Sequence, residues 1–181
     1  QKLMIRYNTL LPRYYRVLEN EDRVNFFKIK DIKVDFQKDE SLEKLWIKHK
    51  SEINQLNLSE IKPEKSLLDL KIQIAKKIFQ NCSFCERKCN TNRTKGKGQC
   101  NVKESKISSE FLHIGEESVL VPSHTIFFSG CTLNCVFCQN WDISQSNKGL
   151  IVEPKILAGI IKTRKKQGSK NVNWVGGDPT P

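Results

Sequence analysis

The seven cysteines of this 181-residue chain constrain its fold more strongly than any other feature. They fall into two groups without remainder: Cys82, Cys85, Cys89 and Cys100, and then Cys131, Cys135 and Cys138. The first residues do not lead into the apolar segment of a secretion signal. Clustered cysteines in a chain without that signal are typical of metal sites rather than disulfide bonds. Because metal ligation requires free thiolates, we expect a reducing, cytoplasmic compartment.

The second cysteine group is compact, with spacings of three and then two residues on the single segment 130–140. A [4Fe-4S] cluster is fully ligated by four thiolates. Three thiolates on one loop therefore leave one iron with an open position, which indicates chemistry on a small molecule. The alternative is a zinc site that takes a fourth ligand from elsewhere, such as His124. The position of the group directly after a predicted strand favours the cluster.

The first cysteine group has the spacing Cys-x2-Cys-x3-Cys-x10-Cys, which suits either a tetrahedral zinc site or a closed iron–sulfur cluster. Gly96 and Gly98 allow the chain to turn back and present Cys100. The surrounding loop, residues 81–105, is too small to build its own core, so we expect a metal to hold it. The sequence leaves two interpretations open, a structural zinc lobe and an auxiliary electron-relay cluster, and it favours the structural metal slightly.

The residues before the cysteines predict a mostly helical region. Apolar residues recur at helical spacing over 41–57, a stripe that includes Leu45, Trp46, Ile53 and Leu56. His49 lies on this stripe, and we interpret it as a packed, structural residue. A second helix is predicted from Pro63 to Phe79, because proline suits a first helical turn. Partial period-two alternation over 26–36 predicts a β-like stretch, and residues 10–15 are interpreted as a docking segment.

The residues after the first cysteine group alternate between strand and helix signals. Residues 111–124 are predicted to be an extended approach segment, with a buried strand over 125–130. A helix is predicted over 154–167, with Gly168 as its C-cap, and a second strand over 171–175. Strand, helix and strand form one βαβ unit, so the two strands should be parallel.

The fold class predicted is therefore α/β, with the start of a partial βα barrel. Because two strands cannot close a barrel, we expect this sequence to be the N-terminal part of a larger enzyme, truncated after the second strand. The predicted regions are a mostly helical segment over 1–80, a four-cysteine metal-binding lobe over 81–110, and the barrel start over 111–181.

The second cysteine group resembles the signature of the radical SAM superfamily, in which an aromatic residue, here Phe137, precedes the third cysteine. Gly176, Gly177 and Asp178 begin a segment that resembles the family's Gly-Gly-Glu-Pro motif, with aspartate in place of glutamate. The resemblance implies a TIM-like radical SAM barrel and a cluster that cleaves S-adenosylmethionine to a 5'-deoxyadenosyl radical. It further implies that Phe137 contacts the adenine and that the Gly-Gly-Asp segment borders the methionine end.

Residues around the cysteines also resemble uncharacterised relatives of the pyruvate formate-lyase activating enzymes. The segments 129–131 and 138–145 carry this closer resemblance. It implies a flavodoxin- or ferredoxin-like electron donor, and a protein substrate such as a glycyl radical enzyme. A small-molecule substrate remains an alternative. Trp141, within the second segment, is interpreted as packed, with shielding of the cluster as the functional alternative.

The chain is basic, with 31 lysines and arginines against 20 acidic residues and a net charge of +11. The excess is spread along the sequence, which is typical of a solvated surface. The alternative function is a non-catalytic zinc or iron–sulfur binding module whose basic surface binds nucleic acid. Arginines are not interleaved with aromatic residues, so nucleic acid is not the favoured partner. The sequence also has no apolar run long enough to cross a membrane.

Overall fold

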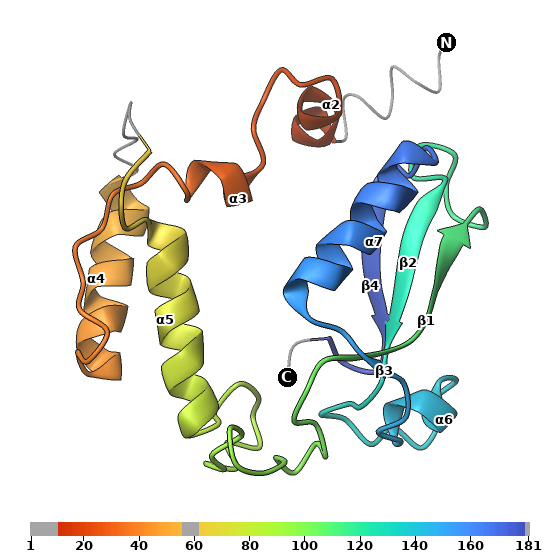
Figure 1. The fold of residues 1–181 in the computed structure, drawn as a ribbon. Helices are drawn as coiled ribbons and strands as arrows, with labels where there is room; N and C mark the ends of the chain where they lie inside the picture. The colour runs from red at the N-terminus through yellow and green to blue at the C-terminus, as the bar shows by residue number, and fades with distance from the viewer. Residues whose placement is uncertain (1–10, 56–61, 180–181) are drawn as a thin grey trace. The chain divides into compact units, whose positions relative to one another are not determined.

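The computed structural model describes residues 11–55 and 62–179 and divides into two compact units, residues 1–77 and 78–181 (Figure 1). Residue 10 of the predicted docking segment and residues 56 and 57 of the predicted helix lie outside the described ranges. Among the described residues, no helix is both long and apolar enough to cross a membrane.

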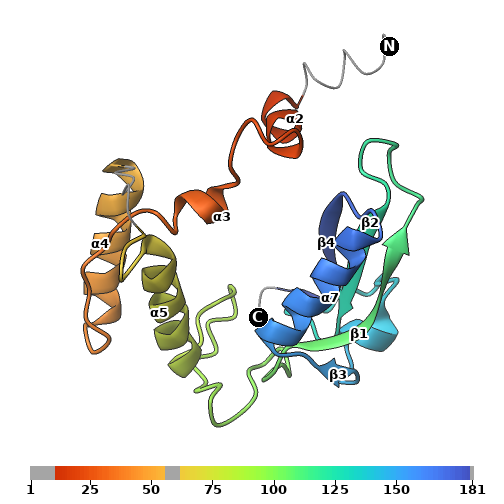
Figure 2. The ribbon, with the colours of Figure 1, turned by 45° about the horizontal axis from the view of Figure 1, so that its top comes forward.

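The first unit is helical. Its elements are α2 (Pro12–Leu18), α3 (Asn25–Lys28), α4 (Leu42–Gln55) and most of α5 (Leu67–Gln80). Figure 2 shows α4 and α5 side by side, as in Figure 1. The core between them is formed by apolar side chains of both helices and of the segment that precedes α4: Ile32, Val34, Phe36, Leu45, Leu67, Leu70 and Ile74. The predicted helix over 41–57 is therefore present, with Leu45 as its buried anchor.

The β-like stretch predicted over 26–36 is wrong for most of its length. Residues 25–28 form the short helix α3, and the C-cap residue Ile29 donates its amide to Asn25 O at 2.9 Å. The Lys30 ammonium lies 4.3 Å from the centre of the Phe26 ring, a cation–π contact that favours this turn. Among the described residues, the strand-like pairing of this stretch is an isolated antiparallel bridge between Lys33 and Ser66.

Helix α5 begins at Leu67 and not at Pro63 as predicted. The start is set by a reciprocal cap. Ser66 Oγ accepts from Asp69 N at 3.3 Å, and Asp69 Oδ2 accepts from Ser66 N at 2.8 Å. These bonds satisfy amide groups that the first helical turn leaves unpaired, which outweighs the preference of proline for that turn.

His49 has the structural role that the sequence predicted. Its Nε2 atom lies 2.7 Å from Lys71 Nζ, and its ring packs at 5.2 Å from that of Trp46. Burial, with a further contribution from the Lys71 charge, lowers the pKa of His49 below its ordinary value. The side chain therefore joins α4 to α5 within the first unit.

The second unit contains a four-stranded sheet with the order β3-β1-β2-β4. The strands are β1 (Lys106–His113), β2 (Ser123–Phe128), β3 (Leu150–Ile151) and β4 (Asn171–Gly176). β2 and β4 pair in parallel and are connected through α7 (Pro154–Lys166), so the predicted βαβ unit is present. β1 pairs antiparallel with β2 and β3 and was not predicted as a strand. A short helix, α6 (Trp141–Ser144), follows the second cysteine group.

One face of this sheet is covered by α7 (Figure 1). The cluster of buried side chains beneath the helix contains Ile107, Ile126, Phe128 and Val152, and Leu157 and Ile161 of α7 pack against it. Because Ile126 and Phe128 are two residues apart on β2, they share the face under the helix. The last residues of β2 are thereby held in place immediately before the second cysteine group.

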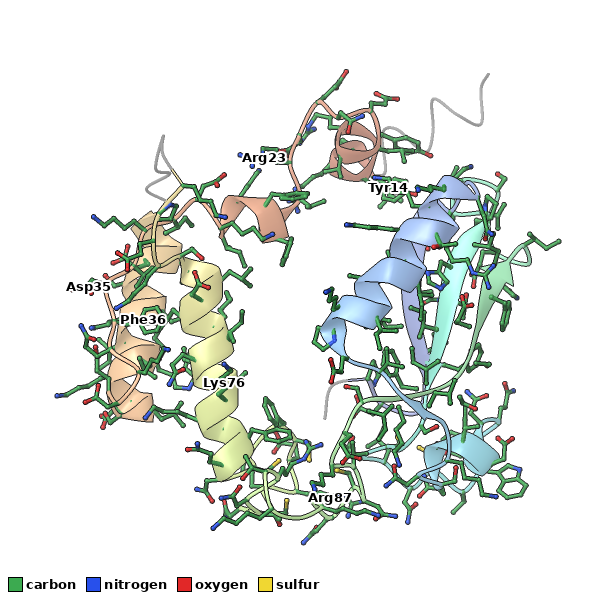
Figure 3. The ribbon with its side chains drawn as sticks, viewed as in Figure 1. Tyr14, Arg23, Asp35, Phe36, Lys76 and Arg87 are labelled. Atoms are coloured by element: carbon green, nitrogen blue, oxygen red, sulfur yellow. The ribbon has the colours of Figure 1, made fainter. Side chains whose placement is uncertain are left out.

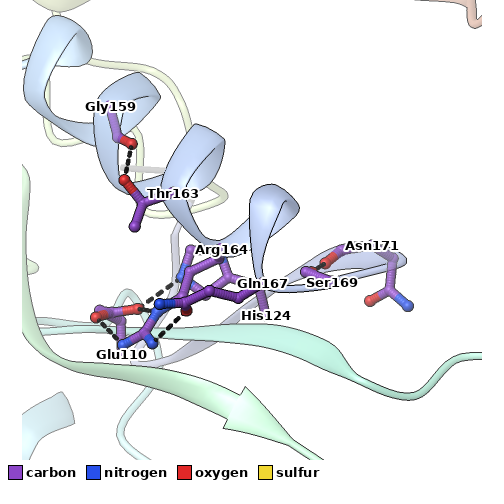
Figure 4. A network of polar contacts seen from close by, with 8 residues as sticks. All are labelled: Glu110, His124, Gly159, Thr163, Arg164, Gln167, Ser169 and Asn171. Atoms are coloured by element: carbon purple, nitrogen blue, oxygen red, sulfur yellow. Dashed lines mark hydrogen bonds and ion pairs between the residues drawn. The ribbon is translucent and has the colours of Figure 1, made fainter.

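A polar network joins α7 to the sheet (Figure 4). Arg164 on α7 donates to Glu110 on β1 through Nε at 2.8 Å and Nη2 at 2.6 Å. The buried His124 on β2 places Nε2 2.9 Å from Glu110 Oε2. Arg164, chiefly through its hydrogen bonds, holds the pKa of Glu110 below its ordinary value. The contact with Glu110 gives His124 a structural role and does not support it as a fourth zinc ligand.

Glu110→Gln is expected to destabilise the second unit by about 1.5–3 kcal/mol at neutral pH, the range for hydrogen bonds to charged groups. Since the pKa of Glu110 is lower when folded, its stabilisation is present above the unfolded pKa. It is lost as the pH falls through the folded value. Urea unfolding at a series of pH values should therefore show that the free energy of unfolding falls less steeply with acidification in Glu110→Gln than in the wild-type chain. The exposed Glu117→Gln is the matched control, and equal acid slopes in the wild-type and Glu110→Gln chains would contradict the prediction.

Candidate metal and cofactor site

The second cysteine group lies on a loop that leaves the end of β2. Gly130 opens the loop with φ +88°, and its amide donates to Ile143 O at 3.0 Å. Cys131 Sγ accepts from Leu133 N at 3.4 Å, while Cys138 Sγ lies 3.3 Å from Ser144 Oγ. The loop therefore folds back on α6, and the sulfur atoms of Cys131 and Cys138 have polar contacts.

The three thiols of this loop are free and influence one another electrostatically. Cys135 is exposed, and Cys131 and Cys138 are partly buried. Burial raises the pKa of Cys131, and the charges of Asp178, Cys138 and Cys135 add to the effect. In the described part of the chain, no three His, Cys, Asp or Glu side chains converge as a formed metal site. The three thiols therefore lie on one loop, and metal binding would have to bring their sulfur atoms closer together.

The Gly-Gly-Asp segment lies directly against this loop. Gly177 N donates to Phe128 O at 2.8 Å, and Asp178 N donates to Gly130 O at 3.0 Å. Thr132 Oγ1 donates to Asp178 Oδ2 across 46 residues of sequence. Two motifs that the sequence identified separately therefore lie side by side at the ends of neighbouring parallel strands.

Glycine is required where the two segments meet. Gly176 has φ +101°, and a Cβ atom on Gly177 would lie 1.7 Å from Gly130 O. Only a residue without a side chain allows the backbones to approach so closely. The resemblance places the glycine pair at the methionine end of the cofactor, and in this structure the absence of a side chain on Gly177 allows the cysteine loop to lie against it.

Two polar residues beside the cysteine loop were not predicted from the sequence. Thr132, between the first two cysteines, holds the carboxylate of Asp178. Asn140 Nδ2, after the third cysteine, donates to Gly176 O at 3.3 Å. Their closeness to the cysteines was the available signal, but side-chain contacts across 36 to 46 residues cannot be read from spacing.

Apolar side chains on and beside the cysteine loop are exposed. Phe137 is 83% exposed, and its neighbour Val136 is fully so. Leu133 and Trp141 are 60% and 69% exposed. The packed position expected for Trp141 is therefore wrong, because α6 directs it to the surface of the unit. The exposed Phe137 ring is available to stack on a flat ligand.

The first cysteine group lies on a loop without helix or strand, residues 81–105. Backbone bonds from Cys82 N to Thr91 O and from Asn90 N to Cys82 O close part of the loop. Amide hydrogen bonds from Thr91 and Gln99, with smaller contributions from the side chains of Thr91 and Cys82, lower the pKa of Cys89 to about 7. Such amide–sulfur bonds stabilise a thiolate, the form that binds metals.

The two cysteine loops contact each other within the second unit. Arg87, labelled in Figure 3, follows Cys85 and precedes Cys89 in the sequence. Its Nε atom donates to Thr132 O at 2.8 Å. The buried Val102 packs against Gly130, where a Cβ would meet Val102 Cγ2 at 2.3 Å. The first cysteine loop thus supports the backbone from which the second one begins.

Comparison with known proteins agrees with this geometry. Residues 125–181 match the sequence model of the radical SAM superfamily. An uncharacterized protein of Methanocaldococcus jannaschii is 48% identical over 94% of this chain and 54% of its own length. The chain therefore spans about half the length of the curated relative it matches. No solved structure matched the chain.

Proposed function

We propose that Cys131, Cys135 and Cys138 hold a [4Fe-4S] cluster that acts on S-adenosylmethionine, a proposal supported by the match of residues 125–181 to the radical SAM superfamily. The observation that carries the proposal is the contact between the cysteine loop and the Gly-Gly-Asp segment. Asp178 N donates to Gly130 O at 3.0 Å, one residue before the first cysteine. A cofactor bound to the cluster would therefore lie next to the backbone at the end of β4.

The residues of the chain have separate roles in this proposal. The three thiolates hold the cluster and, since full ligation takes four, leave one iron for the cofactor. The backbone at Gly176 and Gly177 borders the methionine end, with Asp178 oriented by Thr132. The exposed ring of Phe137 contacts the adenine. When bound, the cluster supplies one electron that splits S-adenosylmethionine into methionine and a 5'-deoxyadenosyl radical.

The test is reductive cleavage by the reconstituted protein. With iron and sulfide restored anaerobically and dithionite as reductant, S-adenosylmethionine should yield 5'-deoxyadenosine and methionine in equal amounts. The same protein without dithionite is the control, because cleavage needs the electron. A reconstituted protein with about four irons per chain that forms no 5'-deoxyadenosine would overturn the proposal.

A finer assignment follows from the resemblance to activating enzymes and is also proposed here. The enzyme would receive its electron from a flavodoxin- or ferredoxin-like donor. Its substrate would be a protein such as a glycyl radical enzyme. The net charge of +11 is complementary to an acidic donor protein. Electron transfer from such a donor should therefore slow as the salt concentration rises.

Phe137→Ala is expected to weaken S-adenosylmethionine binding about fivefold, because an aromatic contact contributes about 0.5–1.5 kcal/mol beyond burial. The side chain is 83% exposed, so the melting temperature should not change. Val136→Ala is the matched control, since Val136 is its fully exposed neighbour. Equilibrium dialysis with labelled cofactor measures both variants. Equal affinities in Phe137→Ala and Val136→Ala would remove Phe137 from the cofactor site.

A further inference from the structure

Arg93 is a buried cation without a buried anion beside it in the described chain. The residue is 1% exposed, and its Nε and Nη1 atoms have no hydrogen-bond partner among the described residues. Its guanidinium carbon lies 4.8 Å from the centre of the Phe79 ring, and its amide donates to Phe79 O at 2.9 Å. A ring face offsets only part of the cost of burying a charge. The position therefore points to an anionic group next to Arg93.

Cysteine thiols, which can carry negative charge, lie close to the Arg93 side chain. The side chains of Cys89, Cys100 and Arg93 surround Gly98. Measured from the position that a Cβ atom on Gly98 would occupy, Cys89 Sγ lies at 3.3 Å, Cys100 Sγ at 3.4 Å and Arg93 Cδ at 3.9 Å. Two thiols of the first cysteine group therefore lie beside the buried Arg93 side chain, in a part of the chain outside residues 125–181.

We propose that Cys82, Cys85, Cys89 and Cys100 bind one zinc ion, and that Arg93 is the buried cation that compensates the charge of this site. Four thiols release four protons to solvent as they bind, which gives a zinc–tetrathiolate centre with a net charge of −2. Arg93 neutralises half of that charge and presents its unpaired N–H groups to the sulfurs. Arg93 is thus a positioning residue, which acts through the thiolates and not on the metal.

The positions of Cys89 and Cys100 suit a single small ion. Both sulfurs lie within 3.4 Å of one point, the position of a Cβ atom on Gly98. With zinc–sulfur bonds of about 2.3 Å, a tetrahedral site holds its sulfurs about 3.8 Å apart. A cubane cluster binds each thiolate to a different iron and separates them further. Binding would complete the site by bringing in Cys82 and also Cys85, which lies on a turn closed by a hydrogen bond from Lys88 N to Cys85 O at 3.0 Å.

The first experiment measures metal content in a chain whose second cysteine group is removed by Cys131→Ala, Cys135→Ala and Cys138→Ala. This background makes the result independent of the proposed radical chemistry, because that cluster has lost its ligands. The chain is purified anaerobically after expression with both iron and zinc, and its metals are counted. About one zinc and no iron per chain is the expected result. A chain without bound metal, or one with about four irons, would overturn the proposal.

The second experiment measures zinc affinity by competition with a chromophoric chelator in the same background. Arg93→Met should weaken binding about 10- to 100-fold, as loss of an outer-shell partner typically does. Arg93→Lys, which keeps the charge, should recover part of the loss. Lys97→Met removes an exposed charge from the same loop and should change affinity by less than about twofold. Unchanged affinity in Arg93→Met would remove Arg93 from the site.

A third measurement does not depend on whether the Arg93 variants fold. The chain that keeps Arg93 is treated with iodoacetamide before and after zinc removal, and the alkylated cysteines are mapped by mass spectrometry. Zinc should protect all four cysteines of the first group together, and chelation should expose them together. Rapid alkylation of any one of the four in the zinc-loaded chain would contradict the tetrathiolate site.

Discussion

Cys135→Ala is expected to remove the visible iron–sulfur absorption of the reconstituted protein and to reduce S-adenosylmethionine cleavage to background. Two thiolates remain on the loop in this variant, too few to hold a [4Fe-4S] cluster that already lacks one protein ligand. Cys135 is the exposed thiol of the three, so its replacement should alter the free energy of unfolding by less than about 0.5 kcal/mol. The loss would therefore report on ligation and not on folding.

The matched control for this variant is Cys100→Ala. It removes one cysteine from the other group, so it should retain the visible absorption and lose bound zinc. Iron content, the absorption spectrum and 5'-deoxyadenosine are measured for both variants in parallel. The assignment of the two groups would be reversed if Cys100→Ala lost the chromophore while Cys135→Ala kept it.

Gly177→Ala is expected to weaken the binding of S-adenosylmethionine about 100-fold. This loss corresponds to about 2.8 kcal/mol of binding free energy, since each tenfold change is about 1.4 kcal/mol. The added Cβ would lie 1.7 Å from Gly130 O and 2.7 Å from Gly130 C. Both are backbone atoms, so no side-chain rotation relieves the clash. The end of β4 must therefore move away from the cysteine loop, which separates the two halves of the proposed cofactor site.

Gly159→Ala provides the control for Gly177→Ala. Gly159 lies in α7, is exposed, and has nothing within 4 Å of its Cβ position. Alanine there should leave affinity unchanged and raise helix stability by up to about 1 kcal/mol. Dialysis against labelled S-adenosylmethionine measures both variants, with circular dichroism to verify folding. Wild-type affinity in a folded Gly177→Ala chain would show that the close approach is not needed for binding.

Sequence reasoning predicted most of the elements that position the site. The helices α4 and α7 and the parallel pair β2 and β4 have strong periodic or apolar signals, and local spacing also defined both cysteine groups. The match of residues 125–181 to the radical SAM superfamily agrees with the resemblance drawn from the cysteine spacing, Phe137 and the glycine pair.

The parts that sequence reasoning missed depend on contacts between distant residues. The polar sequence of β1 gives a weak strand signal, and the strand is held by its pairing with β2. The start of α5 depends on a reciprocal cap at Ser66 that competes with the signal from Pro63. Arg93 is an ordinary basic residue in sequence, and only its burial beside Phe79 sets it apart from other cations of the chain.

The contact between the two cysteine loops gives the first group a role in the proposed chemistry. Arg87 donates to Thr132 O, and Thr132 in turn holds the carboxylate of Asp178. A metal that fixes the first loop would therefore also fix the backbone between Cys131 and Cys135. The proposed zinc ion would therefore also order the proposed S-adenosylmethionine site.

The most direct test of the central proposal is electron paramagnetic resonance of the reduced protein with and without S-adenosylmethionine. A cluster held by Cys131, Cys135 and Cys138 has one iron open to the cofactor. Its spectrum should therefore change when the cofactor is added, and the change should be absent in Gly177→Ala. An iron–sulfur signal that S-adenosylmethionine leaves unaltered in the wild-type protein would contradict the open site on which the account depends.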